Sequence, residues 1–326
     1  MAAAEQIKSL IKSFGDGDET RFYATAMQIA ASEARNGHMA LAEELKKLID
    51  NAKSSRPQNF GVVKSFPLSA TQRELNDLLE LSHPGEKLKE MVLDSTVEKT
   101  LKRILDEHKK LEILRSNNLF PRKKLLFVGP PGCGKTLSAK VLASELAIPL
   151  FIIRLDGLIS RYMGESIAKL RLIFESMNQF RAVYFFDEFD SIGTTRHQQN
   201  DVGEIKRVLN SFLLQIEKDN SNSVVIAATN IPEYLDQALF RRFDDILQYP
   251  LPDVSELKRL FKKELQNFKL SKKFDLQKIA NESIGLSYAD VHRICEDMVK
   301  DYLVYGEGEI SEERLIKYAH HRKNPF

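Results

Sequence analysis

The chain has 326 residues, 43% of them hydrophobic and 29% charged, so it can build roughly two or three domains with a sizeable buried core. Its 48 lysines and arginines nearly balance 46 aspartates and glutamates, which argues against a dedicated nucleic-acid-binding protein with a marked basic excess. Two cysteines exclude a disulfide framework and favour a reducing compartment. No apolar run reaches the length of a membrane span, so we expect a cytoplasmic protein.

Residues 1–52 carry apolar side chains at helical spacing, with breaks at Gly15–Gly17 and Asn36–Gly37, and this pattern predicts three short helices. A helical region of this size buries little core by itself. Two interpretations stay open: an extension that packs on the next domain, and a docking region for a partner. Residues 53–89, which begin with a stretch rich in Ser, Pro and Gly, are predicted to be a linker.

Residues 90–250 have the pattern of an α/β domain, because short β-branched or aromatic runs alternate with helical stretches. Strands that alternate with helices predict a parallel sheet with helices on both faces. Residues 251–326 are helix-periodic throughout and are predicted to form a helical lid domain. The predicted strands are Leu125–Val128, Leu150–Ile153, Val183–Phe186, Val224–Ala228 and Ile246–Tyr249.

A glycine-rich segment follows the first of these strands and leads into a helical stretch. It fits the phosphate-loop pattern G-x-x-x-x-G-K-[ST], in which glycines turn backbone N–H groups toward phosphates. Lys135 would contact the β- and γ-phosphates of ATP, and Thr136 would offer its hydroxyl to Mg²⁺. The alternative is a chance glycine-rich turn. The expected nucleotide-binding residues here are Gly129, Pro130, Pro131, Gly132, Cys133, Gly134, Lys135, Thr136 and Leu137.

Two carboxylates, Asp187 and Glu188, directly follow the apolar run Val183–Phe186. A buried strand would deliver them to the carboxyl edge of the sheet, where ligands of such sheets bind. Asp187 is then placed to hold Mg²⁺ through water, and Glu188 to polarise the attacking water. Without the phosphate loop, a surface acidic turn would be the better interpretation.

From about residue 90 to the C-terminus, these motifs resemble the AAA ATPases. The segment Ala227–Asn230 is similar to the family's sensor-1 segment, which implies that Asn230 orients water near the γ-phosphate. The segment Ile284–Val291 resembles the start of a lid helix that closes over adenine and ribose, which implies that Ala289 contacts the nucleotide. Tyr288 departs from the family there, because it replaces a small residue.

The segment Ala238–Asp244 resembles the family's arginine-finger segment, in which arginines of one subunit approach the γ-phosphate held by its neighbour. Its adjacent Arg241 and Arg242, followed by a phenylalanine, are similar to the katanin and spastin pattern. An always-charged guanidinium suits transition-state charge on phosphoryl oxygens. The alternative is an exposed arginine pair on a loop, and the division of roles between the two arginines stays open.

A further segment, Ile159–Glu165, resembles the substrate pore loop of protein-threading AAA rings. An aromatic residue with an apolar neighbour can grip varied side chains, and a glycine gives the loop room to move. The alternative is that the aromatic and its neighbour pack in the core. The residues that carry this resemblance are Arg161, Tyr162, Met163 and Gly164.

The resemblance implies an Mg²⁺-dependent ATPase that assembles as a homo-oligomeric ring, expected to be a hexamer, and that remodels or threads a protein substrate. Bacterial stand-alone AAA proteins encoded beside a subtilisin-like serine protease are similar throughout, which implies a partner protease and a role in plasmid maintenance or phage defence. The alternative is an ATP-driven assembly switch that acts on nucleic acid or a partner protein without threading.

Overall fold

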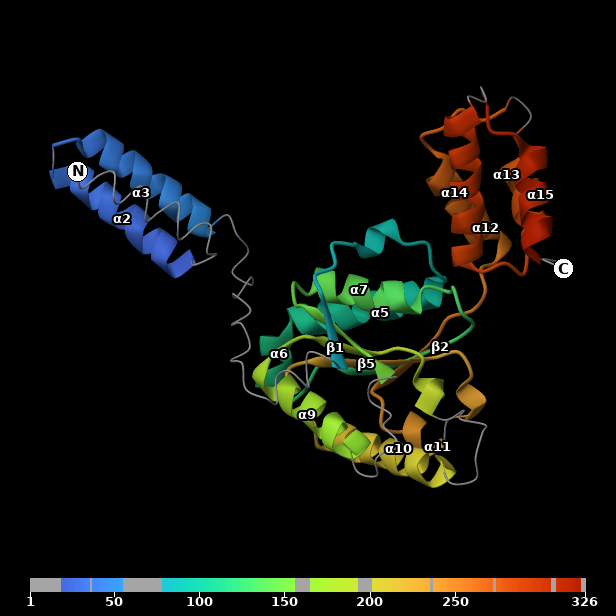
Figure 1. Ribbon diagram of the computed structural model, residues 1–326, viewed down its shortest axis with the longest axis horizontal. Coiled ribbons are helices and arrows are strands. Elements are labelled where there is room, and N and C mark those ends of the chain that lie inside the picture. The colour runs from blue at the N-terminus through green and yellow to red at the C-terminus, as the bar shows by residue number, and fades with distance from the viewer. Residues whose placement is uncertain are drawn as a thin grey trace. The chain divides into compact units, whose positions relative to one another are not determined.

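The computed structural model describes most of the chain, which divides into two units, Met1–Pro67 and Leu68–Phe326 (Figure 1). The described residues are 19–35, 37–54, 78–155, 165–192, 201–234, 237–271, 274–305 and 309–323. None of the helices in these ranges is long and apolar enough to cross a membrane.

The first unit contains a helical hairpin of α2 (Glu19–Arg35) and α3 (Met39–Ser54). Its turn follows the break predicted at Asn36–Gly37: Gly37 has a φ of 88°, and its N–H donates to the carbonyl of Ala34 at 3.2 Å. The first of the three helices predicted for 1–52 lies outside the described residues. Large apolar side chains remain exposed along the hairpin, namely Met27, Met39, Leu41 and Leu48.

The second unit is built on a six-stranded sheet in the order β1-β3-β4-β5-β2-β6. Strand β1 runs antiparallel to β3, and every other neighbouring pair is parallel. The predicted α/β fold class is therefore confirmed, and each predicted strand is present within one residue of its expected ends. The strands are β1 (Leu79–Ser82), β2 (Lys124–Val128), β3 (Leu150–Ile153), β4 (Val183–Phe186), β5 (Val224–Thr229) and β6 (Asp245–Gln248).

The edge strand β1 lies within residues 53–89, the stretch that the sequence predicts as a linker. Its four residues read Leu-Glu-Leu-Ser, and only Leu79 is buried. These residues alternate apolar and polar over four positions, which is the shortest stretch that can signal a half-buried strand, and the linker prediction missed this signal.

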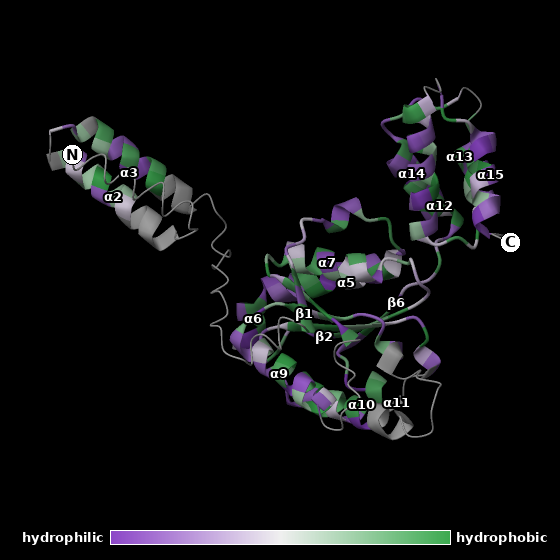
Figure 2. Cartoon of the chain, in the orientation of Figure 1, coloured by the Kyte–Doolittle hydropathy of each residue, from purple (hydrophilic) through white to green (hydrophobic). Residues whose placement is uncertain are grey.

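Helices cover both faces of this sheet, as a parallel sheet requires (Figure 1). One face carries α5 (Ser95–Lys109) and α7 (Lys135–Glu145), and the other carries α9 (Glu165–Gln179) and α10 (Asp201–Lys218). Hydrophobic residues concentrate on the strands and on the inner sides of these helices (Figure 2). The shorter helical segments are η1 (Leu88–Glu90), α6 (Leu111–Ser116), η2 (Phe189–Ile192), η3 (Pro232–Tyr234) and α11 (Gln237–Phe240).

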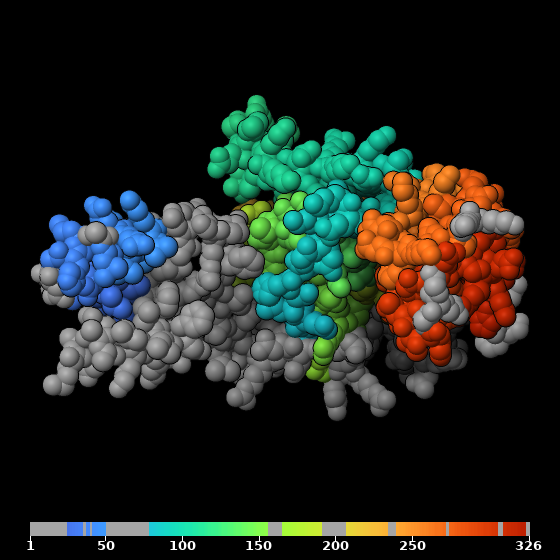
Figure 3. Space-filling view, turned by 90° about the horizontal axis from the view of Figure 1, so that it is seen from above, coloured from blue at the N-terminus to red at the C-terminus, as the bar shows by residue number. Residues whose placement is uncertain are grey.

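A helical lid with its own hydrophobic core follows the sheet. Its first helix begins with a capping box, in which the Asp253 carboxylate accepts the N–H of Glu256 at 2.7 Å and the Glu256 carboxylate accepts the N–H of Asp253 at 2.9 Å. In Figure 3 this helix (orange) lies against the segment that follows β1 (cyan). The lid helices are α12 (Val254–Leu265), α13 (Leu276–Glu282), α14 (Tyr288–Tyr305) and α15 (Glu312–Lys323).

Candidate nucleotide-binding site

A cleft of about 550 Å³ opens between the carboxyl edge of the sheet and the lid. The residues that line this cleft fall into two groups. The polar end, at the sheet, is lined by Lys135, Thr136, Asp187, Glu188 and Asn230. The lid end combines apolar residues with charged or titratable ones, namely Met91, Leu93, Leu260, Tyr288 and Ala289 together with Glu90, Lys263, Glu264 and His292.

The phosphate loop connects β2 to α7 and adopts a backbone conformation that needs glycine. Gly129 has a φ of 148°, and a Cβ atom there would lie 2.1 Å from the carbonyl oxygen of Tyr249, the residue that follows β6. Gly134 caps the first turn of α7 in the left-handed region, with a φ of 95°. The loop therefore places unpaired backbone N–H groups at the start of a helix, where anions bind.

Lys135 is the first residue of α7, and its side chain folds back over the loop. Its Nζ donates to the carbonyls of Gly129 at 2.7 Å and Pro130 at 2.9 Å, and to Oδ1 of Asn230 at 2.8 Å. Burial lowers the pKa of Lys135, while the nearby carboxylate of Asp187 works against that shift. The lysine, the loop and the predicted sensor-1 asparagine thus meet at one point.

Thr136 and Asp187 also meet at this end of the cleft. The Thr136 hydroxyl donates to Oδ2 of Asp187 at 2.9 Å, and Oδ1 of Asp187 accepts the N–H of Glu188 at 2.9 Å. Adjacent hydroxyl and carboxylate oxygens are the ligands that Mg²⁺ prefers, so this donor set fits the ion. Glu188 has a φ of 49°, a left-handed backbone that a non-glycine residue adopts at a cost of about 1–3 kcal/mol.

The sequence around this site is similar to known proteins. The family model described as "ATPase family associated with various cellular activities (AAA)" matches residues 125–251. A Sinorhizobium fredii protein named as the uncharacterized AAA family ATPase y4kL is 33% identical over 315 residues, which cover 96% of this chain and 93% of that protein. The chain belongs to the AAA family of ATPases. A Plasmodium falciparum protein named as a candidate cell division cycle ATPase is 32% identical over 231 residues, 69% of this chain and 18% of that protein.

In this AAA ATPase the start of α14 contacts the phosphate loop directly. The N–H of Ala289 donates to the carbonyl of Gly132 at 3.1 Å. The Ser287 hydroxyl and N–H donate to Oδ2 of Asp290, and Oδ1 of Asp290 accepts Nε of Arg322 at 3.0 Å. Ala289 therefore lines the cleft beside the phosphate loop, and its contact with a nucleotide stays a prediction.

Two contacts near the cleft are not predicted from the sequence. Oδ1 of Asp190 accepts the N–H of Asn230 at 3.2 Å and so anchors the end of β5. The hydroxyl of Tyr288 donates to Oε2 of Glu256 at 2.9 Å. The acidic residues that follow β4 mark Asp190 as part of the site, but no motif marks Glu256 or its contact with Tyr288.

The side chain of Cys133 does not face the cleft. It is 1% exposed and packs in the core beneath the loop, and burial raises the pKa of its thiol. Any contact of Cys133 with a nucleotide is therefore made by its backbone. The other predicted loop residues that line the cleft are Pro131, Gly132, Gly134 and Leu137.

Arg241 and Arg242 lie outside the cleft of their own chain. Nε of Arg242 donates to Oε1 of Glu217 at 2.6 Å, and the Arg242 side chain is 29% exposed. Arg241 is exposed on the loop that follows α11. The structure thus brings the predicted loop, acid, sensor and lid residues to one cleft. Both arginines lie away from that cleft. The predicted pore-loop residues, Arg161, Tyr162, Met163 and Gly164, lie outside the described residues.

Proposed function

We propose that the protein is an Mg²⁺-dependent ATP hydrolase that works as a homo-oligomeric ring. The observation that carries this proposal is the meeting of Lys135, the Thr136–Asp187 pair and Glu188 at the polar end of one cleft. Each residue type has a distinct task in phosphoryl transfer, and AAA family membership supports ATP as the nucleotide.

The chemistry follows from these contacts. Nζ of Lys135, now held by two carbonyls and Asn230, would turn to phosphate oxygens that compete for the same donor. Thr136 and Asp187 would hold Mg²⁺, which when bound offsets negative charge on the phosphates. Glu188 would polarise the attacking water. Asn230, held in place through its N–H by Asp190, would orient that water.

We further propose that Arg241 and Arg242 act on the cleft of a neighbouring copy. Neither arginine lines the cleft of its own chain, so a role in catalysis requires a second subunit. A guanidinium supplied in trans typically contributes about 10³–10⁵ in rate in GTPase systems. The similarity to the katanin and spastin pattern, and a hexameric ring, belong to this proposal.

A mixing experiment tests the shared centre. Lys135→Ala protein, which cannot hold ATP, and Arg241→Ala protein, which lacks one arginine, should each have low ATPase activity. Mixed interfaces that pair an intact cleft with an intact arginine should restore part of that activity. A wild-type specific rate that is independent of protein concentration, together with no restoration in the mixture, would refute the shared centre.

For the biological role, we propose that the ring remodels or threads a protein substrate through a channel lined by Tyr162 and Met163. The resemblance of Ile159–Glu165 to the pore loop supports this role. A subtilisin-like serine protease partner in plasmid maintenance or phage defence extends the same resemblance. The alternative is an ATP-driven assembly switch that acts on nucleic acid or on a partner protein without threading. Glu188 favours turnover over a pure switch, because a switch needs no water-activating acid.

A further inference from the structure

Beside the lid end of the cleft lies a polar pair with no part in the proposed chemistry, of which Tyr288 lines the cleft and Glu256 does not. The hydroxyl of Tyr288, at the start of α14, donates to Oε2 of Glu256 in the first turn of α12. Glu256 is 5% exposed, so its carboxylate is held away from water. Oε2 accepts both the phenol and the N–H of Asp253, and Oε1 lies 4.0 Å from Nη2 of Arg259. Burial, together with this hydrogen bond, raises the pKa of Tyr288, so the phenol stays protonated and donates at neutral pH.

The ring of Tyr288 lies at the junction of the two hydrophobic cores. It packs against the core of the α/β domain and also against the core of the lid. The next residue, Ala289, hydrogen-bonds the phosphate loop at Gly132. The hydrogen bond to Glu256 therefore fixes a ring that sits where the lid meets the phosphate loop.

The first lid helix also holds the opposite wall of this end. Nη2 of Arg259 donates to the carbonyl of Leu93 at 3.0 Å, and Nζ of Lys263 donates to the carbonyl of Glu90. Met91 and Leu93, which these contacts hold in place, line the cleft opposite the lid. Glu256 and both cations belong to α12, so one helix positions both walls.

The two ends of the cleft suit the two ends of a nucleotide. Lys135 and the backbone N–H groups of the phosphate loop attract phosphates, which leaves the flat, apolar base for the other end. An aromatic ring that stacks on a base typically contributes about 5–150-fold in affinity. Such a ring contributes most when it is already held in place, because less freedom is lost on binding.

We propose that Tyr288 and Glu256 are a positioning pair that fixes the base end of the cleft: Tyr288 forms the wall against the base, and Glu256 holds that wall in place. The inference rests on the proposed nucleotide binding but separates from it, because the pair governs only the part of the affinity that the base contributes.

Calorimetric titration of the full chain with ADP and with tripolyphosphate tests the pair, since tripolyphosphate has phosphates but no base. Tyr288→Phe keeps the ring and removes the hydroxyl, and should weaken ADP binding about tenfold while tripolyphosphate stays within about twofold. Glu256→Ala should have the same effect, and the double variant should be no weaker than either. Glu256→Gln still accepts the phenol and caps α12, and should bind ADP nearly as the wild type does.

Tyr318→Phe is the matched control. Tyr318 donates to Oδ2 of Asp301 at 2.7 Å in the same lid, and it does not line the cleft. Loss of ADP affinity in Tyr318→Phe equal to that in Tyr288→Phe would overturn the inference, as would equal weakening of ADP and tripolyphosphate, or no weakening. If Glu256→Ala fails to fold, Tyr288→Phe and Glu256→Gln still decide. Wild-type protein that binds neither ligand would refute the proposed function itself.

Discussion

At the scale of single residues, Gly132 is a point of close contact between the phosphate loop and the lid. Its φ is 76°, and a Cβ atom there would lie 2.5 Å from the Ser287 hydroxyl oxygen and 3.0 Å from the Cβ of Ala289. Both the loop conformation and the close packing of the lid on the loop therefore require a residue without a Cβ atom at this position.

We expect Gly132→Ala to push the lid away from the loop, because both the backbone and the contact with Ser287 oppose a methyl group. The free energy of unfolding should fall by about 1–3 kcal/mol, and nucleotide affinity should fall with it. Thermal unfolding and titration with ADP measure the two effects. Gly85→Ala is the matched control, since no atom lies within 4 Å of a Cβ there. Wild-type stability and affinity in Gly132→Ala would contradict the expectation.

The sequence predicts the parts of the site that are contiguous and leaves out those that are paired across the chain. Lys135, Thr136 and Asp187 are predicted because a loop motif and a strand end fix their places before any tertiary contact is known. Glu256 is not predicted, because its partner Tyr288 belongs to a different helix and neither residue type has a fixed role there.

At the scale of elements, the same reasoning explains which strands the sequence predicts and which it does not. The residues of β4 and β5 are all buried, and such strands read as continuous apolar runs that the sequence predicts within one residue. Strand β1 is a short edge strand with one buried residue, and its apolar–polar alternation spans only four positions. Prediction therefore succeeds where burial dictates a continuous apolar run and fails where the strand is short and mostly exposed.

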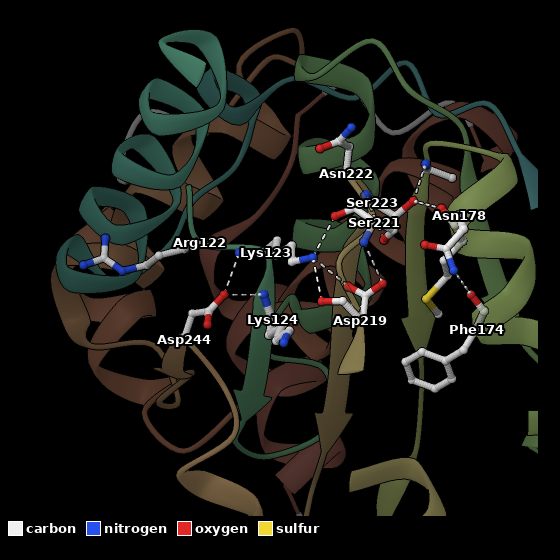
Figure 4. A network of polar contacts seen from close by, with 12 residues as sticks. Arg122, Lys123, Lys124, Phe174, Asn178, Asp219, Ser221, Asn222, Ser223 and Asp244 are labelled. Carbon is white, nitrogen blue, oxygen red and sulfur yellow. Dashed lines mark hydrogen bonds and ion pairs between the residues drawn. The ribbon is translucent and has the colours of Figure 1, made fainter. Parts of the chain in front are cut away.

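A polar network joins the beginnings of β2 and β5 to the end of α10 (Figure 4). Nζ of Lys123 donates to Oδ2 of Asp219 at 2.8 Å and to the carbonyl of Ser221 at 2.7 Å. The Asp219 side chain is 1% exposed. A cavity of about 660 Å³ lies at this edge of the sheet, opposite the nucleotide cleft, and both Lys123 and Asp219 line it. The network therefore fixes the sheet edge away from the site.

Asp219→Asn should destabilise the fold at neutral pH. Burial works to raise the pKa of Asp219, but hydrogen bonds from Lys123 and Ser221 outweigh it and hold the pKa below its ordinary value. A lowered folded-state pKa contributes stability above the unfolded value of about 3.9, and this contribution disappears as pH falls through the folded value. We expect the free energy of unfolding to fall by about 1.5–3 kcal/mol at pH 7. Urea unfolding measures this loss, which should shrink below pH 4.

The control for this change is Asp297→Asn. Asp297 is 56% exposed and lies 3.8 Å from Nζ of Lys300, so its loss should change stability by less than about 0.5 kcal/mol. A destabilisation of Asp219→Asn that stays constant from pH 7 to pH 3 would mean that packing, and not the charge, is responsible.

At the scale of the whole molecule, every described residue that lines the cleft lies between Glu90 and His292, within the unit Leu68–Phe326. We therefore expect removal of the first unit to separate nucleotide chemistry from any docking, and to decide between the two interpretations left open for residues 1–52.

Removal of Met1–Pro67 should leave ADP affinity within about twofold and should abolish work on a protein substrate if residues 1–52 are a docking region. An extension that packs on the α/β domain would behave differently, because its removal would expose apolar surface and lower the Tm by about 2 °C or more. The comparison is Tyr162→Ala in the full chain, which still contains the first unit. This variant should keep ATP hydrolysis and lose only threading. ATPase rate, Tm and substrate unfolding, measured together on both proteins, distinguish recruitment from pulling. A truncated chain that still unfolds substrate at the wild-type rate would exclude the docking role.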